Sequence, residues 1–146
     1  MTAKIFVDSN VLVYSRDSAE PDKQAQAHAW LAELWQRRQG ALSFQVLQEF
    51  YVTVTRKLDP GLPAAEARAD VRALLAWNPI RTDAVLLEGA WQIEDRFKLS
   101  WWDSLIVAAA QRAAARYLLS EDFQAGQDLG GLIVVSPFQS RYADLP

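Results

Sequence analysis

Four acidic side chains fall where a parallel sheet would bring them to one edge. Asp8 directly follows the first apolar run of the chain, and Asp122 follows a later apolar run with two residues between. Glu49 and Asp103 fall within the first two turns of predicted helices that begin at the same edge. Because ligands of open parallel sheets bind outside the carboxyl ends of the strands, a functional site is expected at this edge.

Carboxylates gathered in this way repel one another unless something relieves the repulsion. At an effective dielectric constant near 20, two charges about 4 Å apart cost on the order of 4 kcal/mol. The cluster therefore either retains protons at raised pKa or binds cations. Oxygen ligands without histidine or cysteine suit Mg²⁺ or Mn²⁺, ions whose bound water can attack a phosphate.

Each acid also has an interpretation that needs no function. Asp8 could be a turn residue, and Glu49 could lie on an exposed helix face. Asp103 could complete a capping box with Ser100, and Asp122 could cap a short helix that begins at the next residue. The functional reading is favoured because all four acids fall on one predicted edge.

The composition excludes several other kinds of site. The chain of 146 residues contains no cysteine and one histidine, His28, so thiolate chemistry, disulfides and multi-histidine metal sites within one chain are excluded. His28 lies in an alanine-rich predicted helix and is expected to be structural. The chain shows neither a secretory signal nor a membrane-spanning apolar run, so we expect a cytoplasmic protein.

Strand-like and helix-like segments alternate along the chain. The pattern predicts strands at residues 5–7, 41–43, 117–119 and 132–135, with Ile80 in a further strand, and helices at 21–39, 44–58, 63–76, 83–97 and 101–115. Ser9 and Asn10 are expected in a turn after the first strand. Long helical connections imply right-handed crossovers and a mainly parallel sheet. We therefore predict one α/β domain over residues 1–135 and a peripheral tail over residues 136–146.

Two further groups of residues are candidates for contacts with a ligand. Trp101 and Trp102 are neighbours on one helix and cannot both face inward, so one is expected to be exposed to a partner or a base. Arg96 and Lys98 come just before this helix and are candidate contacts for RNA phosphates.

Four stretches, in this order and spacing, resemble the motifs of PIN-domain ribonucleases. They are FVDSNVLVY at residues 6–14, VLQEFY at 46–51, WWDSLIVAAA at 101–110 and LLSEDF at 118–123. The resemblance covers nearly the whole chain. The size and the short first strand are also similar to the toxin halves of bacterial VapBC toxin–antitoxin pairs.

The resemblance implies a three-layer α/β/α sandwich and Mg²⁺- or Mn²⁺-dependent hydrolysis of RNA that leaves 5′-phosphate and 3′-hydroxyl ends. Asp8 and Asp103 match the principal metal-binding acids, and Glu49 and Asp122 match the acids that complete the site. Asn10 and Ser120 match polar residues that support them, which makes six residues in all. A toxin of this kind further implies a cognate antitoxin and a homodimer.

Two other classes of function remain as alternatives. Phosphoryl-transfer and receiver-type domains also place acids at strand ends, but a receiver needs an adjacent acid pair after the first strand and a lysine near the last, which this sequence lacks. The second alternative is a non-catalytic binding module that keeps the same fold.

Overall fold

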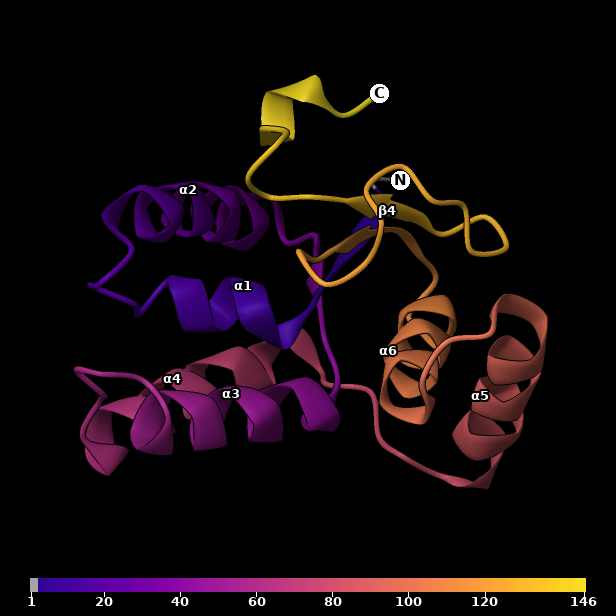
Figure 1. Cartoon of the computed structure of the whole chain (residues 1–146), viewed down its shortest axis with the longest axis horizontal. Coiled ribbons are helices and arrows are strands. Elements are labelled where there is room, and N and C mark those ends of the chain that lie inside the picture. Colours follow the sequence, from indigo (N-terminus) through magenta and orange to yellow (C-terminus); the bar gives the residue numbers. More distant parts are fainter. Residues whose placement is uncertain (1–2) are drawn as a thin grey trace.

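Residues 3–146, which the computed structural model describes, form a four-stranded sheet surrounded by six α-helices (Figure 1). In chain order the elements are β1 (Lys4–Val7), α1 (Ser9–Tyr14), α2 (Pro21–Arg37), β2 (Gly40–Ala41), α3 (Phe44–Arg56), α4 (Ala64–Leu74), α5 (Ala84–Phe97), α6 (Trp101–Arg112), β3 (Ala115–Leu119) and β4 (Ile133–Val135). Short 3₁₀ turns follow α4 and β4.

The strands run in the order β2-β1-β3-β4, and every neighbouring pair is parallel, which confirms the prediction of a mainly parallel sheet. β1 lies between β2 and β3 and is buried from Ile5 to Val7, as expected for a central strand covered on both faces. The backbone N–H of Asp8 donates to the carbonyl of Leu119 (3.0 Å). The carboxyl ends of β1 and β3 are therefore joined, and Asp8 lies at that junction.

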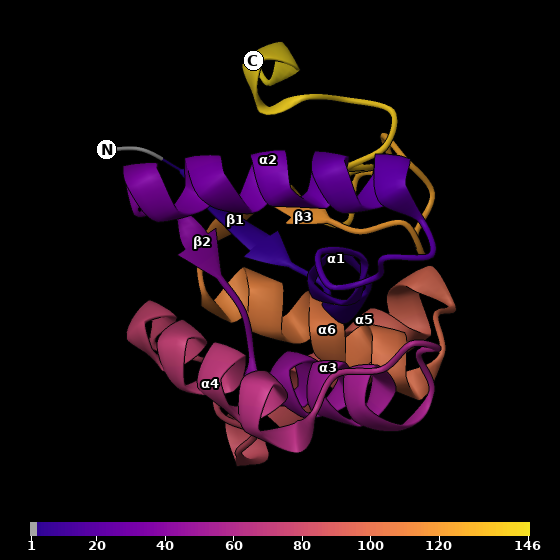
Figure 2. The same ribbon diagram turned by 90° about the vertical axis from the view of Figure 1, so that its left-hand side faces the viewer.

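The helices cover both faces of the sheet, which confirms an α/β sandwich. Figure 2 shows β1 and β3 between α2 on one side and α6 on the other, with α3, α4 and α5 beyond the sheet on the side of α6. α6 is buried from Ser104 to Ala110, and its alanines allow close packing. Within residues 3–146 none of the helices has the length and apolar character needed to cross a membrane.

The structure corrects several predicted boundaries. Ser9 and Asn10 begin α1 instead of forming a turn. β2 spans Gly40–Ala41 and not residues 41–43. Its register pairs Gly40 with Ile5 and Ala41 with Phe6, and the pairing with β1 ends there. Ile80 makes a single bridge to Ser43 and belongs to no strand.

Four of the predicted helices extend too far at their C-terminal ends, whereas α5 ends at Phe97 as predicted. α2 ends at Arg37, and Arg38 turns into the left-handed conformation two residues before Gly40. α3 ends at Arg56, and α4 ends at Leu74 and continues as a 3₁₀ turn. α6 ends at Arg112 because Ala114 adopts a left-handed conformation, so β3 begins at residue 115.

The segment 136–146 packs on α2 (Figure 1). The buried indole of Trp30 donates to the carbonyls of Pro137 and Ser140, both at 3.1 Å. Tyr142 packs edge-on against Trp30 with the ring centroids 6.0 Å apart, and its hydroxyl donates to the side chain of Gln39. These contacts join the end of the chain to α2 and to the side chain of Gln39.

Candidate active site

Asp8 is a buried carboxylate at the carboxyl end of β1, and it also caps α1. One oxygen accepts from the backbone N–H of Ser9 (2.8 Å) and the other from the hydroxyl of Ser120 (2.7 Å). Burial raises the pKa of Asp8 to about 7; the hydrogen bonds from Ser120 and Ser9 lower it in part, and the charges of Asp122 and Glu49 raise it further.

A chain of hydrogen bonds connects Asp8 to Asp122. The amide nitrogen of Asn10 donates to the hydroxyl of Ser120 (3.0 Å) and to a carboxylate oxygen of Asp122 (3.2 Å). The amide oxygen of Asn10 accepts from the backbone N–H of Glu121 (3.1 Å), and the Ser120 hydroxyl accepts from that of Asp122 (3.1 Å). The start of α1 is thereby locked to the loop after β3.

Glu49 reaches the same region from α3. Ser43 caps this helix by accepting from the backbone N–H of Val46 (3.3 Å), which places Glu49 in the second turn. Partial burial raises the pKa of Glu49, hydrogen bonds from the side chains of Gln45 and Ser9 lower it, and the charges of Asp103 and Asp122 raise it. The interpretation of Glu49 as an exposed helix residue is therefore wrong.

Asp103 lies in the first turn of α6, where the hydroxyl of Ser100 accepts from its backbone N–H (3.2 Å). Partial burial raises the pKa of Asp103, and the nearby charge of Asp122 adds to the effect. The charge of Asp122 acts on Asp8, Glu49 and Asp103, and the charge of Glu49 acts on Asp8. The four acids therefore face the same region of the molecule, with Asp122 near the other three.

The four carboxylates do not converge closely on one point. Among residues 3–146, no three acidic or histidine side chains are placed so that together they could hold one metal ion. The donor set nevertheless fits Mg²⁺ or Mn²⁺ in its chemistry, because the ligands are hard oxygens and a cation would offset the burial and the mutual repulsion that raise these pKa values. Mg²⁺ in particular is usually bound through one or two carboxylates and retains several waters.

The comparison with protein families agrees with this arrangement. The model of the PIN domain family matches residues 5–126, which contain all four acids. The chain belongs to the PIN domain family. PIN domains are generally nucleases, and they typically use divalent metal ions.

Among solved structures, this PIN domain is similar to a chain described as "Toxin-antitoxin complex from Klebsiella pneumoniae". The two chains are 20% identical, and the match covers 92% of this chain and 98% of the other, with a TM-score of 0.58. At this identity the likeness supports the fold. The search of curated proteins finds no match.

Two structural interpretations of the acids can now be judged within the PIN fold. Asp8 does not occupy a turn but the N-cap of α1. Asp122 caps no helix, because the residues after it form bends and turns up to β4. Ser100 does cap α6, so Asp103 is both a first-turn residue and a member of the acidic site.

Arg96 lies apart from the acids. Its guanidinium stacks over Phe97 at 4.8 Å and lines a cavity with Gln92, Gln111 and Gly130. Lys98 ends α5 in a left-handed conformation. Neither residue lines the cavity that borders Glu49. Lys23 of α2 contacts Glu121, the residue before Asp122, at 2.6 Å.

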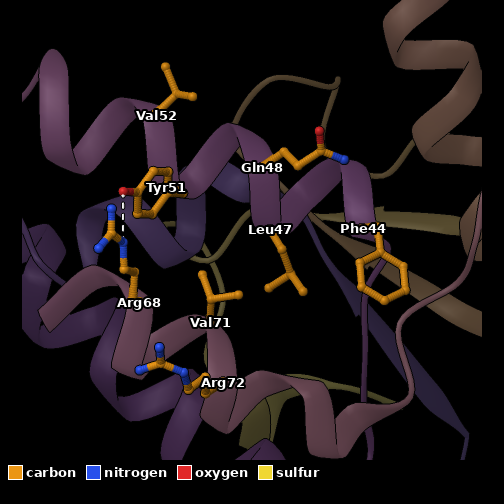
Figure 3. A pocket seen from close by; sticks show the side chains of 8 residues that line it. All are labelled: Phe44, Leu47, Gln48, Tyr51, Val52, Arg68, Val71 and Arg72. Atoms are coloured by element: carbon orange, nitrogen blue, oxygen red, sulfur yellow. Dashed lines mark hydrogen bonds between the residues drawn. The ribbon is translucent and has the colours of Figure 1, made fainter. Parts of the chain in front are cut away.

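Two cavities lie along α3. One borders Glu49 and has a volume of about 540 Å³; it is lined by Gln45, Gln48, Glu49, Thr82, Leu87, Trp101, Trp102 and Leu105. The other lies between α3 and α4 and contains none of the four acids (Figure 3).

The sequence had indicated that one of Trp101 and Trp102 is exposed, and the structure shows that it is Trp102. The support that Ser9 gives to Glu49 was not predicted, since no local pattern reveals a contact between α1 and α3. Gln45 precedes Glu49 by four residues on α3, a spacing that could have indicated its contact.

Proposed function

We propose that this PIN domain is a divalent-metal-dependent endoribonuclease and the toxin of a toxin–antitoxin pair. The observation that supports this most is a nearly buried Asp8, with its pKa raised to about 7, near the charges of Asp122 and Glu49, while the charge of Asp122 also acts on Asp103. At neutral pH Asp8 is close to half-protonated, so a bound cation can readily replace its proton.

Each residue has a definite role in the proposed reaction. Asp8 and Asp103 would hold Mg²⁺ or Mn²⁺, and the ion would supply a polarised water and offset charge on the phosphate oxygens. Ser120 and the N–H of Ser9 fix the two oxygens of Asp8, so its orientation is set before substrate arrives. Asn10 fixes Asp122 in the same way.

Glu49 is suited to accept the proton of the attacking water, because partial burial raises its pKa. The water oxygen bonds to phosphorus in line with the bond from phosphorus to O3′, which breaks. The proton passes to a carboxylate, and O3′ takes a proton from solvent. The products carry a 5′-phosphate and a 3′-hydroxyl.

The proposed partners are an antitoxin and a second copy of this chain, acting in the cytoplasm. The structural neighbour was solved as a toxin–antitoxin complex, and this supports an antitoxin for the present chain. The net charge of −3 is compatible with RNA as substrate when a metal ion lies between the acids and the phosphate.

RNA cleavage tests the proposal. The protein should cut RNA with Mg²⁺ or Mn²⁺ and stop when a chelator is added. Replacing both Asp8 and Asp103 by asparagine should lower the rate by more than about 100-fold. Asp95→Asn, which removes an exposed acid on α5, should leave the rate unchanged.

Cleavage that survives in the double variant would refute the roles given to these two acids. Metal binding in calorimetry without turnover on any RNA would instead identify a binding module. A stable aspartyl-phosphate after treatment with a phosphate donor would identify a phosphoryl-transfer domain.

A further inference from the structure

The cavity beside Glu49 has an aromatic wall that the proposed hydrolysis does not use. Trp102 is 63% exposed, the largest exposure of any tryptophan among the exposed apolar residues, and it immediately precedes Asp103. An exposed indole leaves a large apolar face in water, an arrangement that is common where a flat ligand binds.

The wall is held in place by its neighbours. Trp101, on the same turn of α6, stacks on Trp91 of α5 with the rings 6.1 Å apart and inclined by 27°. The side-chain amide of Gln45 donates to the backbone carbonyl of Trp102 (3.3 Å) and so ties α3 to α6 across the cavity. The backbone that carries the Trp102 indole is therefore fixed by both helices.

The polar groups of the cavity suit a neutral ligand with a hydrogen-bonding edge. Gln45, Gln48 and Thr82 contribute amides and a hydroxyl, and no arginine or lysine is among the lining residues. Gln48 is exposed, and Figure 3 shows its side chain extending along α3 toward Phe44, away from Val71 and Arg72. A nucleobase offers a flat face for an indole and polar edge atoms for amides, whereas a phosphate would find no cation here.

We propose that Trp102 stacks on an unpaired nucleobase next to the scissile phosphate. The inference rests on the proposed nuclease function and adds a residue for substrate recognition to it. The position of Glu49 carries the argument, because this acid and Trp102 line the same cavity. A base in a duplex is stacked between its neighbours and cannot lie against the indole.

Binding to RNA without turnover tests the base site directly. The Asp8→Asn, Asp103→Asn protein serves as background, and the probes are copies of one labelled single-stranded RNA with an abasic residue at successive positions. At one position, removal of the base should weaken binding by about 5- to 150-fold, measured by fluorescence anisotropy. When Trp102→Ala is added to this background, the affinity for the intact RNA should fall by the same factor as removal of the base causes. Removal of the base should then weaken the binding of this variant no further.

Three comparisons separate stacking from a structural effect. Trp102→Phe should restore most of the affinity, because an aromatic face remains. Trp35→Ala removes another exposed indole, on α2, and should leave RNA affinity unchanged. In the cleaving protein, Trp102→Ala should lower kcat/KM for the intact RNA but not for the RNA that lacks this base.

The results also separate this inference from the nuclease proposal. A base effect that depends on Trp102 supports the site even if the unmodified protein cuts no RNA. The site is overturned, even if the protein is a nuclease, if the losses of RNA affinity caused by Trp102→Ala and by removal of the base simply add. It is also overturned if a blunt RNA duplex binds as tightly as the single-stranded RNA. The site is also overturned if Trp102→Ala leaves RNA affinity unchanged and converts a dimer to a monomer in ultracentrifugation, since the face would then bind protein.

Discussion

The environment of Asp8 opposes its charge. The side chain accepts two good hydrogen bonds, from Ser120 and from the N–H of Ser9, and both favour the ionised form. Burial outweighs them, and the charges of Asp122 and Glu49 add to it, so the pKa is raised from 3.8 to about 7. At neutral pH a bound cation would thus take the place of a proton on Asp8.

The raised pKa predicts how the stability of the metal-free protein depends on pH. Between the unfolded pKa near 4 and the folded value of about 7, the folded protein holds a proton that the unfolded chain has lost. The free energy of unfolding should therefore fall as pH rises through this window, by up to about 1.4 kcal/mol per pH unit from this group. Asp8→Asn cannot ionise and should reduce the slope, as measured by urea unfolding at several pH values in the presence of a chelator.

Asp95→Asn is the matched control for the pH series and should keep the slope of the unmodified protein. Glu49 and Asp103 also have raised pKa values, so part of the slope should remain in Asp8→Asn. An identical slope in Asp8→Asn and the unmodified protein would mean that burial does not perturb Asp8.

The candidate acids could be found from sequence because each has a local signature. Asp8 directly follows a buried strand, and Asp103 lies in a capped first turn. The contacts that support them have no such signature. Asn10 contacts Ser120 and Asp122, which are 110 and 112 residues away in the chain, so only the folded sheet brings them together. For the same reason Arg96, close to Asp103 in sequence, proved to lie against a different cavity.

Among the elements, helix starts were easier to predict than helix ends. Asp83 and Ser100 accept from the N–H groups of the first turns of α5 and α6, a pairing that residue type alone indicates. The ends of α2 and α6, which lie earlier than predicted, depend on the non-glycine residues Arg38 and Ala114 in the left-handed conformation. These conformations are disfavoured locally, so the packing that imposes them cannot be read from the sequence.

β2 and α5 provide a matched pair of glycine substitutions. A Cβ at Gly40 would overlap the ring of Trp77, so Gly40→Ala should lower the free energy of unfolding by about 1–3 kcal/mol. At Gly89, inside α5, the nearest atom to a new Cβ is the Cβ of Ala108 at 4.0 Å. Gly89→Ala should therefore raise stability by about 0.5–1 kcal/mol through helix propensity.

Chemical denaturation of both glycine variants measures the two effects. The test is that the free energy of unfolding falls in Gly40→Ala and rises in Gly89→Ala. A general effect of added volume would change both free energies in the same direction. If Gly40→Ala is as stable as the unmodified protein, the edge strand is not held against Trp77 as described.

On the scale of the whole molecule, the end of the chain packs on α2, the helix that covers the face of the sheet opposite α3 and α6. Trp30 is 2% exposed, and both acceptors of its indole N–H belong to the segment after β4. Phe138 of the same segment packs edge-on against Tyr14 at 5.0 Å, next to Lys23. The predicted domain of residues 1–135 therefore leaves out contacts that α2 makes with residues 137–142.

Truncation after Val135 tests whether the predicted domain is sufficient. Removing the segment would expose the indole of Trp30 and take away both of its acceptors, so we expect the free energy of unfolding to fall by at least about 2 kcal/mol. Trp30→Phe in the full chain keeps most of the apolar area and loses the hydrogen bonds, so it should cost less than the truncation, about 1–2 kcal/mol. Both are measured by urea unfolding. Equal stability of the truncated and full chains would show that residues 1–135 fold independently, and that α2 is held on the sheet by its other contacts alone.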